Sequence, residues 1–339
     1  MTHRFGVIGV GTWGEQHLKA ISTHPHCELA IICDLDEGLV KRRAAEYGAK
    51  AWTTDYRGVL DQPDIAAVSI VTPDHAHRQI AVAAAEAGKH ILIEKPLATT
   101  VDECEAILAA AEANGVRIMV DFHNRFNVPF VNAKRAIEDG EIGEPQMLSM
   151  RLNDTIFVPT GMLSWAGKST VAWFLASHGV DLVRWLMDDE IVRVHSVARS
   201  RVLAKMGINT PDFFQTILEL AKGGVAHIEN CWIMSTSMPT VFDFKVELIG
   251  DKGTLFADLS SHRMLQKYTP AEAVYPDCTA VPMVHGRYVG FAIESIRHWL
   301  DSVIQDKDPM ITGEDGLAAT RVVCAIHESA ESGQPVELA

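Results

Sequence analysis

The sequence has no long hydrophobic run. Of its 339 residues 47% are hydrophobic, but nowhere do about 18 apolar residues follow one another as a membrane-spanning helix requires. The opening residues MTHRFGVIGV lack the charged start and the cleavage site of a secretory signal peptide. We therefore expect a folded cytoplasmic protein with no membrane partner. The length favours two domains, each with its own hydrophobic core.

The chain is also poor in positive charge and in cysteine. It has 30 Lys and Arg against 44 Asp and Glu, a net charge of −14 and no basic cluster. This balance argues against nucleic acid and favours a neutral or modestly polar small molecule. The six cysteines are scattered, with no pair at the spacing of metal ligands. We expect free, buried thiols, with neither disulfides nor a metal site.

Residues 4–122 alternate short β-branched runs with helical patterns. Such alternation builds a parallel sheet covered on both faces by helices. We expect residues 1–122 to form a first domain of α/β class. Its strands are expected at residues 5–10, 28–34, 65–72, 90–95 and 117–122, and its helices at 14–23, 76–88 and 101–115.

The pattern changes after residue 122, where strand-like runs become longer and helices fewer. We expect residues 123–339 to form a substrate-binding and oligomerisation domain of α+β class, with a large, mostly antiparallel open sheet. Whether the closing helices pack back on the first domain is left open. The expected helices lie at 129–139, 287–305 and 313–333, and the strands at 146–154, 192–200, 213–220, 225–235, 244–250 and 253–259.

A glycine motif, VIGVGTWG, follows the first expected strand. Gly9 permits a tight turn, Gly11 lets the backbone approach a pyrophosphate, and Gly14 allows close packing of helix on strand. The helix N-terminus adds amide donors for the anion. Asp34 ends the second strand twenty residues after Gly14, where its carboxylate can bind both ribose hydroxyls. The combination indicates a Rossmann dinucleotide-binding domain.

The residues after Asp34 distinguish between the two nicotinamide cofactors. Leu35 and Asp36 stand where an arginine or serine would bind a 2′-phosphate, so NAD is favoured over NADP. We count Thr12, Trp13 and Leu35 with the glycines and Asp34 as expected cofactor contacts.

Lys95 is the first candidate catalytic residue. In ILIEKPLAT, Glu94, Lys95 and Pro96 come at the carboxyl end of a strand, the edge where open α/β sheets bind ligands. A lysine there can reach a substrate hydroxyl, and the positive nicotinamide ring beside it would lower its pKa. Taken alone, the tripeptide would be interpreted as an ordinary strand end with a surface ion pair.

The segment FLASHGVDLVRWL, residues 174–186, places an imidazole and a carboxylate one helical turn apart, at His178 and Asp181. If His178 lies in the first turn of its helix, the helix dipole lowers its pKa and keeps it neutral as a proton acceptor. The alternative is a packed or surface histidine beside a solvated carboxylate.

Together these motifs resemble the glucose-fructose oxidoreductase, inositol dehydrogenase and MocA family of NAD(P)-dependent sugar and cyclitol dehydrogenases. The resemblance spans nearly the whole chain. It implies a nucleotide-binding domain and an α/β domain whose open sheet carries substrate on one side and subunit contacts on the other, in a homodimer or homotetramer. It rests on the glycine motif, the His178/Asp181 helix, VTPDHAH at 71–77, EKP at 94–96, NRF at 124–126 and GEDGLAATRVVCAIHESAESGQPV at 313–336.

The resemblance implies roles for individual residues. Lys95 and His178 become the catalytic pair, with His178 facing the nicotinamide and Asp181 orienting side chains one turn below. For each histidine near the cofactor, packing or capping is the alternative role. The residues implied around the cofactor are Thr72, Pro73, His75, His77, Glu94, Lys95 and His123.

Phe174 departs from the family pattern. Many polyol-oxidising members carry an aspartate four residues before the histidine, where it shares the substrate hydroxyl with the lysine and histidine. Here Phe174 occupies that position. Either Lys95 and His178 suffice, or Asp154 substitutes, or the chemistry differs.

The polar stretch 154–173 is expected to be a functional loop. A tryptophan face suits the CH surface of a sugar ring, although Trp173 fits packing between the domains equally well. The expected substrate contacts are Arg125, Asp154, Trp165, Lys168, Trp173 and Asp181.

We therefore expect an NAD-dependent dehydrogenase that oxidises a secondary hydroxyl of a sugar, cyclitol or sugar derivative to a ketone. Two alternatives differ in class. One is a glycosidase or lyase that uses tightly held NAD for a transient oxidation, and the other is a non-catalytic protein that senses NAD or a sugar.

Overall fold

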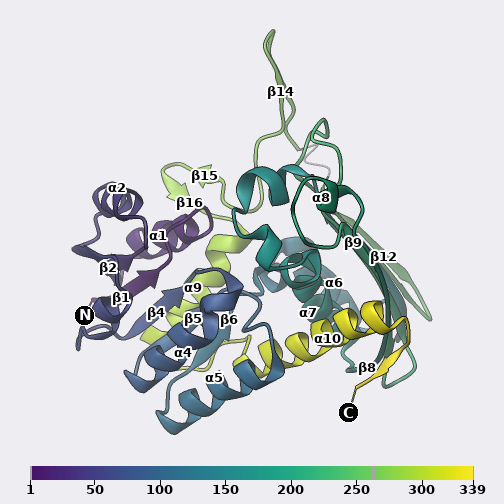
Figure 1. Cartoon of the computed structure of the whole chain (residues 1–339), viewed down its shortest axis with the longest axis horizontal. Coiled ribbons are helices and arrows are strands. Elements are labelled where there is room, and N and C mark those ends of the chain that lie inside the picture. Colours follow the sequence, from purple (N-terminus) through teal and green to yellow (C-terminus); the bar gives the residue numbers. More distant parts are fainter. Residues whose placement is uncertain (1, 261–263, 339) are drawn as a thin grey trace. The chain divides into compact units, whose positions relative to one another are not determined.

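The chain divides into two compact units. The computed structural model describes residues 2–260 and 264–338. One unit comprises Met1–Asn127 and Thr279–Leu317, and the other comprises Val128–Cys278 and Ala318–Ala339 (Figure 1). In the described part of the chain, no helix combines the length and the apolar character needed to cross a membrane.

The first unit is built on a six-stranded sheet in which all neighbouring strands are parallel, in the order β3-β2-β1-β4-β5-β6. The order reverses between β1 and β4, and open sheets of this kind bind ligands outside the carboxyl ends of the strands at that point. The strands are β1 (His3–Ile8), β2 (Cys27–Cys33), β3 (Ala51–Thr53), β4 (Ala67–Ile70), β5 (His90–Ile93) and β6 (Ile118–Val120).

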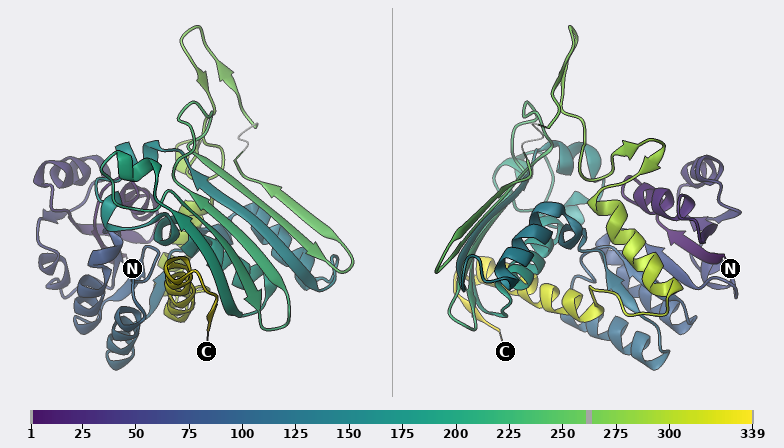
Figure 2. Two further views of the ribbon diagram at one scale, coloured as in Figure 1. Left: turned by 45° about the vertical axis from the view of Figure 1, so that its right-hand side comes forward. Right: turned by 180° about the vertical axis from the view of Figure 1, so that it is seen from behind.

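Helices cover both faces of this sheet, so β4 is buried along its whole length. Helices α1 and α9 pack together on one face, and α4 and α5 pack together on the other (Figure 2). The helices are α1 (Gly14–Ser22), α2 (Glu37–Tyr47), α3 (Arg57–Leu60), α4 (His77–Glu86), α5 (Val101–Ala113) and α9 (Phe291–Ile304), with short turns η1 (Asp74–Ala76) and η2 (His123–Phe126) and a hairpin of β15 (Met283–Val284) and β16 (Arg287–Tyr288).

The predicted α/β class is confirmed, but the sequence pattern missed α2 and β3. Helix α2 buries only Val40 and Ala44, so its apolar stripe is too narrow to give a clear helical period. Its start is set by Asp36, whose side chain accepts a hydrogen bond from the backbone N–H of Leu39 at 2.9 Å.

The second unit contains a seven-stranded sheet in the order β12-β11-β7-β10-β9-β8-β17. Only the β7–β10 pair is parallel within this described sheet, which confirms the prediction of a mostly antiparallel sheet. The strands are β7 (Pro145–Asp154), β8 (Ile191–Arg199), β9 (Phe213–Leu220), β10 (Val225–Cys231), β11 (Phe242–Gly250), β12 (Thr254–Asp258) and β17 (Val336–Glu337), and a small hairpin of β13 (Lys267–Tyr268) and β14 (Ala273–Val274) projects from this unit (Figure 2).

The two faces of this sheet differ in what covers them. Figure 2 shows α6 (Val128–Glu138), α7 (Ser177–Met187) and the second-unit part of α10 (Gly313–Ser332) against one face, and no described helix against the other. Residues alternate accordingly between the two faces. In β7, for example, Leu148 is 1% exposed and its neighbour Met147 is 48% exposed.

The stretch between β7 and α7 is more ordered than the predicted loop. It forms three short helical turns, η3 (Val158–Met162), η4 (Ala166–Lys168) and η5 (Ala172–Ala176). Because η5 continues directly into α7, His178 lies beyond the first turn of the helical run. His178 is nonetheless the second residue of α7 itself, so a helix-dipole effect on its pKa stays a prediction.

Candidate functional site

The glycine loop between β1 and α1 contains two glycines required by packing and one that faces open space. A Cβ on Gly9 would lie 2.2 Å from the carbonyl oxygen of Val71, and one on Gly14 would lie 2.2 Å from the carbonyl oxygen of Gly9. Around Gly11, no described atom lies within 4 Å of the Cβ position. The backbone of Gly11 is therefore accessible from outside, as a bound pyrophosphate requires.

Asp34 is held beside this loop by the backbone. Its Oδ2 accepts a hydrogen bond from Val10 N–H at 2.9 Å, and its Oδ1 accepts one from Asp36 N–H at 3.0 Å. Each carboxylate oxygen keeps a further lone pair for a ribose hydroxyl. Leu35 is 91% exposed. The glycine loop and Asp34 together fit a bound dinucleotide.

The loop after β4 contains the next group of expected cofactor residues. Thr72 and Pro73 are half-buried and His75 is exposed. His77 is buried, with Nδ1 2.8 Å from the carbonyl oxygen of Pro96 and Nε2 2.9 Å from that of Thr72. His77 thus joins the loops that follow β4 and β5, which is the packing role left open by the sequence.

Lys95 follows β5 at the carboxyl edge of the sheet, half-buried and joined to Pro96 by a cis peptide bond. The preceding residue, Glu94, is 7% exposed. Glu94 therefore points into the interior of the unit. The sequence interpretation had expected it to contact the cofactor.

Glu94 belongs to a buried polar cluster that the sequence interpretation missed. His17 Nε2 lies 3.0 Å from Glu94 Oε1 and 4.0 Å from Asp121 Oδ2, and the Ser295 hydroxyl donates to Asp121 Oδ1. Burial lowers the pKa of His17 to about 4 and raises that of Glu94 to about 7. Burial, and then the charge of Glu94, raise the pKa of Asp121 well above its usual range.

His123 lies between two aromatic rings of the first unit. Its ring centroid is 5.1 Å from that of Trp13 and 5.4 Å from that of Phe291. Burial lowers the pKa of His123 to about 3, and the positive charges of Lys95 and His17 act in the same direction. His123 is therefore a neutral imidazole at physiological pH.

Arg125 takes part in an internal ion pair. It is 7% exposed, and its Nη2 donates to Asp315 Oδ1 at 3.1 Å. Asp315 also accepts a hydrogen bond from Thr312 N–H at 3.0 Å. The structure therefore gives Arg125 a tertiary contact within the first unit, and its expected contact with substrate stays a prediction.

In the second unit, His178 and Asp181 are both buried, with exposed fractions of 6% and 0%. Between them, Gly179 packs α7 closely on the sheet, because a Cβ there would lie 3.4 Å from Met150 Sδ. The interpretation of Asp181 as a solvated side chain was therefore wrong. Its full burial suits a residue that orients its neighbours.

Phe174 lies in an aromatic group that also holds a carboxylate. Its ring centroid is 5.7 Å from that of Trp232 and 6.3 Å from that of Trp165. The indole Nε1–H of Trp232 donates to Asp154 Oδ2 at 3.3 Å, and Asp154 is 5% exposed. The sequence interpretation missed Trp232, although the alternation of the predicted strand 225–235 places it on the same inner face as Ala226 and Ile228.

The other two candidates in this stretch differ in burial. Trp173 is 9% exposed and stacks on His327, with ring centroids 5.3 Å apart. His327 in turn contacts the Thr170 hydroxyl at 2.8 Å. Trp173 thus packs against His327 within the second unit, whereas Lys168 is exposed.

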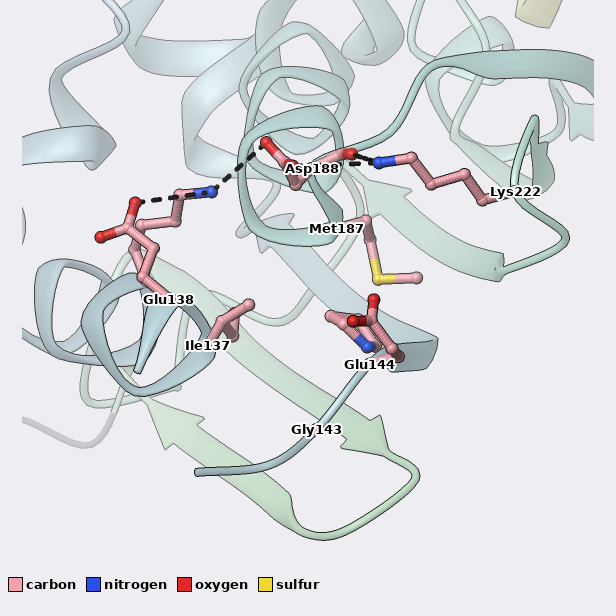
Figure 3. Close-up of a pocket in the computed structure, with 9 residues that line it drawn as sticks. Ile137, Glu138, Gly143, Glu144, Met187, Asp188 and Lys222 are labelled. Atoms are coloured by element: carbon pink, nitrogen blue, oxygen red, sulfur yellow. Dashed lines mark hydrogen bonds and ion pairs between the residues drawn. The ribbon is translucent and has the colours of Figure 1, made fainter. Parts of the chain in front are cut away.

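A pocket of about 270 Å³ lies elsewhere in the second unit, between α6, the end of α7 and the β9–β10 turn (Figure 3). Both lysines that line it have carboxylate partners. Lys134 Nζ lies 3.8 Å from Glu138 and 3.7 Å from Asp188, and Lys222 Nζ lies 3.8 Å from Asp188. None of the predicted site residues lines it.

The parallel sheet, the glycine loop and the acidic residue at the end of β2 define a protein with a Rossmann-type dinucleotide-binding unit. Residues 3–122 match the model described as "Oxidoreductase family, NAD-binding Rossmann fold", and residues 134–338 match "Oxidoreductase family, C-terminal alpha/beta domain". The chain belongs to this GFO/IDH/MocA oxidoreductase family.

Similar proteins match over nearly their whole length. The "uncharacterized oxidoreductase YrbE" of Bacillus subtilis (strain 168) is 31% identical over 98% of this chain and 96% of its own. The "scyllo-inositol 2-dehydrogenase (NAD(+))" of the same organism is 29% identical over 99% and 96%. A crystal structure of an oxidoreductase domain protein from Kribbella flavida is 27% identical, covers 100% of both chains and has a TM-score of 0.83.

The low pKa of His123 predicts how stability depends on pH. The unfolded histidine, with a pKa near 6.5, binds a proton that folded His123, with a pKa of about 3, does not bind. Stability contributed by the neutral ring is therefore lost as pH falls below about 6.5. Between pH 7 and pH 5, the free energy of unfolding should fall by about 2 kcal/mol less in His123→Gln than in the wild type. Denaturant titration at the two pH values measures this difference.

Exposed His26 in the same unit provides the control for that experiment. The His26→Gln variant should keep the pH dependence of the wild type. An unchanged pH dependence in His123→Gln would show that folded His123 binds a proton as readily as the unfolded residue does.

Proposed function

We propose that this protein oxidises a secondary hydroxyl of a cyclitol or a sugar derivative to a ketone, with transfer of hydride to NAD. The observation that carries the proposal is the position of Lys95, half-buried at the carboxyl edge of the same sheet that presents the open Gly11 backbone and Asp34. The relative named scyllo-inositol 2-dehydrogenase (NAD(+)) supports a cyclitol as substrate and NAD as cofactor.

Two residues of this chain would move the hydroxyl proton. Bound NAD supplies the hydride acceptor, so the protein has to remove the proton that leaves the same carbinol group. A neutral Lys95 amine can accept it, and neutral His178 is the second proton-transfer group. Asp181, buried one turn away on α7, orients His178 and its neighbours.

The aromatic group around Phe174 suggests how the second unit replaces the missing aspartate. Asp154 is connected to Phe174 through Trp232, which contacts the ring of one and the carboxylate of the other. We propose that Asp154 supplies the carboxylate for a substrate hydroxyl. Trp165 and Phe174 then offer flat apolar surfaces to the CH face of the ring.

Removal of either proton-transfer group should lower turnover. We expect Lys95→Ala to abolish most of kcat while NAD still binds, and His178→Ala to lower kcat/KM by roughly 10²–10⁴-fold, because each removes a positioned base. Asp181→Asn should have a smaller effect. The assay follows NADH absorbance with inositols and sugars, and fluorescence titration measures NAD binding.

The same assay separates the alternatives. Product that forms without accumulation of NADH would identify the glycosidase or lyase chemistry. If no substrate of the panel reacts while NAD binds, the sensing function is favoured. If His178→Ala lowers the melting temperature but leaves turnover intact, His178 is a packing residue.

The proposed cofactor preference depends on Asp34. We expect NAD to bind at least tenfold more tightly than NADP, about 1.4 kcal/mol, because the carboxylate accepts ribose hydrogen bonds and repels a 2′-phosphate. Asp34→Ala should weaken NAD and narrow the difference. Glu86→Gln, which removes an exposed carboxylate from α4, is the control and should leave the difference unchanged. Equal wild-type affinities for the two cofactors in a titration would contradict the proposal.

We further propose that the uncovered sheet face of the second unit joins copies of this chain. Met147 pairs with Val225 on one side and with Ile249 on the other, so exposed apolar side chains form a continuous row across three strands. Phe256, on β12, is 74% exposed on the same face. Exposed apolar surface of this extent marks an association surface.

Light scattering at micromolar concentration tests this surface. The wild type should be a dimer or tetramer, and the double variant Met147→Glu/Val225→Glu should be a monomer, because it places charge at the centre of the row. Val128→Glu, at a position that is 66% exposed at the start of α6, should leave the mass unchanged. A monomeric wild type would rule the interface out.

A further inference from the structure

The buried cluster behind Lys95 arises from strand order. Strands β5 and β6 are parallel neighbours with Ile93 opposite Val120, so the next residues, Glu94 and Asp121, leave the sheet side by side. His17 on α1 and Ser295 on α9 approach the same two carboxyl groups. The exposed fractions of Glu94 and Asp121 are 7% and 0%.

The charges of this cluster do not balance if both carboxyl groups ionise. Atoms of His17, Glu94 and Asp121 all lie within 4.8 Å of one another. Two carboxylates this close in a buried site repel strongly, and buried His17 is a neutral imidazole with a pKa of about 4. The pair therefore retains one proton near neutral pH, and the proton belongs to the pair rather than to either residue.

Lys95 is coupled electrostatically to one member of the pair. Lys95 directly follows Glu94 in the chain, and its positive charge lowers the pKa of Glu94. Coupling between two titrating groups is reciprocal, so an ionised Glu94 favours the ammonium form of Lys95 by the same free energy.

The groups that face the pair come from every surrounding element of the first unit. They are His17 on α1, Lys95 after β5 and Ser295 on α9, and His123 on η2 lies near Lys95 and His17, whose charges lower its pKa. Both histidines are neutral at neutral pH, because burial lowers the pKa of His17 to about 4 and that of His123 to about 3.

We propose that Glu94, Asp121, His17 and Ser295 form a one-proton site that limits the negative charge next to Lys95, so that Glu94 and Asp121 are positioning residues for its amine. With both carboxyl groups ionised, Lys95 would be held as an ammonium and could not accept a proton. One retained proton halves that charge. The inference rests on the proposed function only in giving Lys95 the proton-transfer role.

The site predicts opposite effects for two nearly isosteric changes. Glu94→Gln removes the charge to which Lys95 is coupled, so the pKa of Lys95 should fall by about one pH unit, a tenfold change in proton affinity. Asp121→Asn leaves the remaining charge entirely on Glu94, so the pKa of Lys95 should rise. A change that merely disturbs the fold would move both in the same direction.

The measurement needs no substrate. Lysines of the full-length apoprotein are reductively methylated with ¹³C and titrated by NMR, and the Lys95→Arg variant assigns the Lys95 resonance. Glu86→Gln, which removes an exposed carboxylate from α4, should leave the Lys95 titration unchanged. A Lys95 pKa unaltered by Glu94→Gln, or shifts of equal sign in the two variants, would overturn the proposal.

A third variant keeps the proposal testable if Glu94→Gln or Asp121→Asn fails to fold. Ser295→Ala removes only the hydroxyl that donates to Asp121, which transfers negative charge to Glu94 and should raise the Lys95 pKa. The titration is carried out with and without EDTA, and a shift caused by EDTA, or a stoichiometric metal ion lost in His17→Ala, would overturn the one-proton site. If the protein fails to oxidise any cyclitol, that result contradicts the proposed function alone, because the Lys95 titration is carried out without substrate.

Discussion

The close approach of backbone to backbone at the end of β1 is the constraint on which the nucleotide-binding unit depends. Gly9 and Gly14 leave no room for a Cβ, so the chain turns at one point and α1 starts in one direction. That direction carries His17 toward the carboxyl ends of β5 and β6. The same turn presents Val10 N–H to Asp34, which ties the end of β2 to the loop.

This constraint connects the cofactor edge of the sheet with its buried interior. The outer side of the loop offers the Gly11 backbone to a ligand, and the inner side positions an imidazole against two carboxyl groups. A change in the entry angle of α1 would affect both together. Binding of the dinucleotide and the electrostatic environment of Lys95 are therefore set by one local geometry.

The second unit accommodates polar groups in a different way. On its uncovered sheet face, Asn153 and Gln215 donate to the two carboxylate oxygens of Glu229 at 2.6 and 2.8 Å. Although burial alone would raise it, these hydrogen bonds lower the pKa of Glu229, so the carboxylate is fully satisfied within its own sheet. A partner covering this face would meet apolar side chains beside a carboxylate that is already hydrogen-bonded within the sheet.

The sequence by itself determined the features that depend on local spacing. The glycine motif, Asp34 twenty residues later and the strand-ending Lys95 were recognisable because a turn, a helix start and a strand end follow one another along the chain. The alternating burial in β9 and β10 likewise followed from a period of two. Helix α2 was not predicted from the sequence, because its apolar stripe is too narrow to give a clear helical period.

Only the tertiary structure decided which polar residues meet. Glu94 lies 27 residues before Asp121, and Ser295 a further 174 residues on, and their contact follows from strand order and helix packing. Trp232 and Asp154 meet across 78 residues for the same reason. Spacing along the chain cannot encode such pairs, because each depends on the register of separate strands and on the burial that alters their charge.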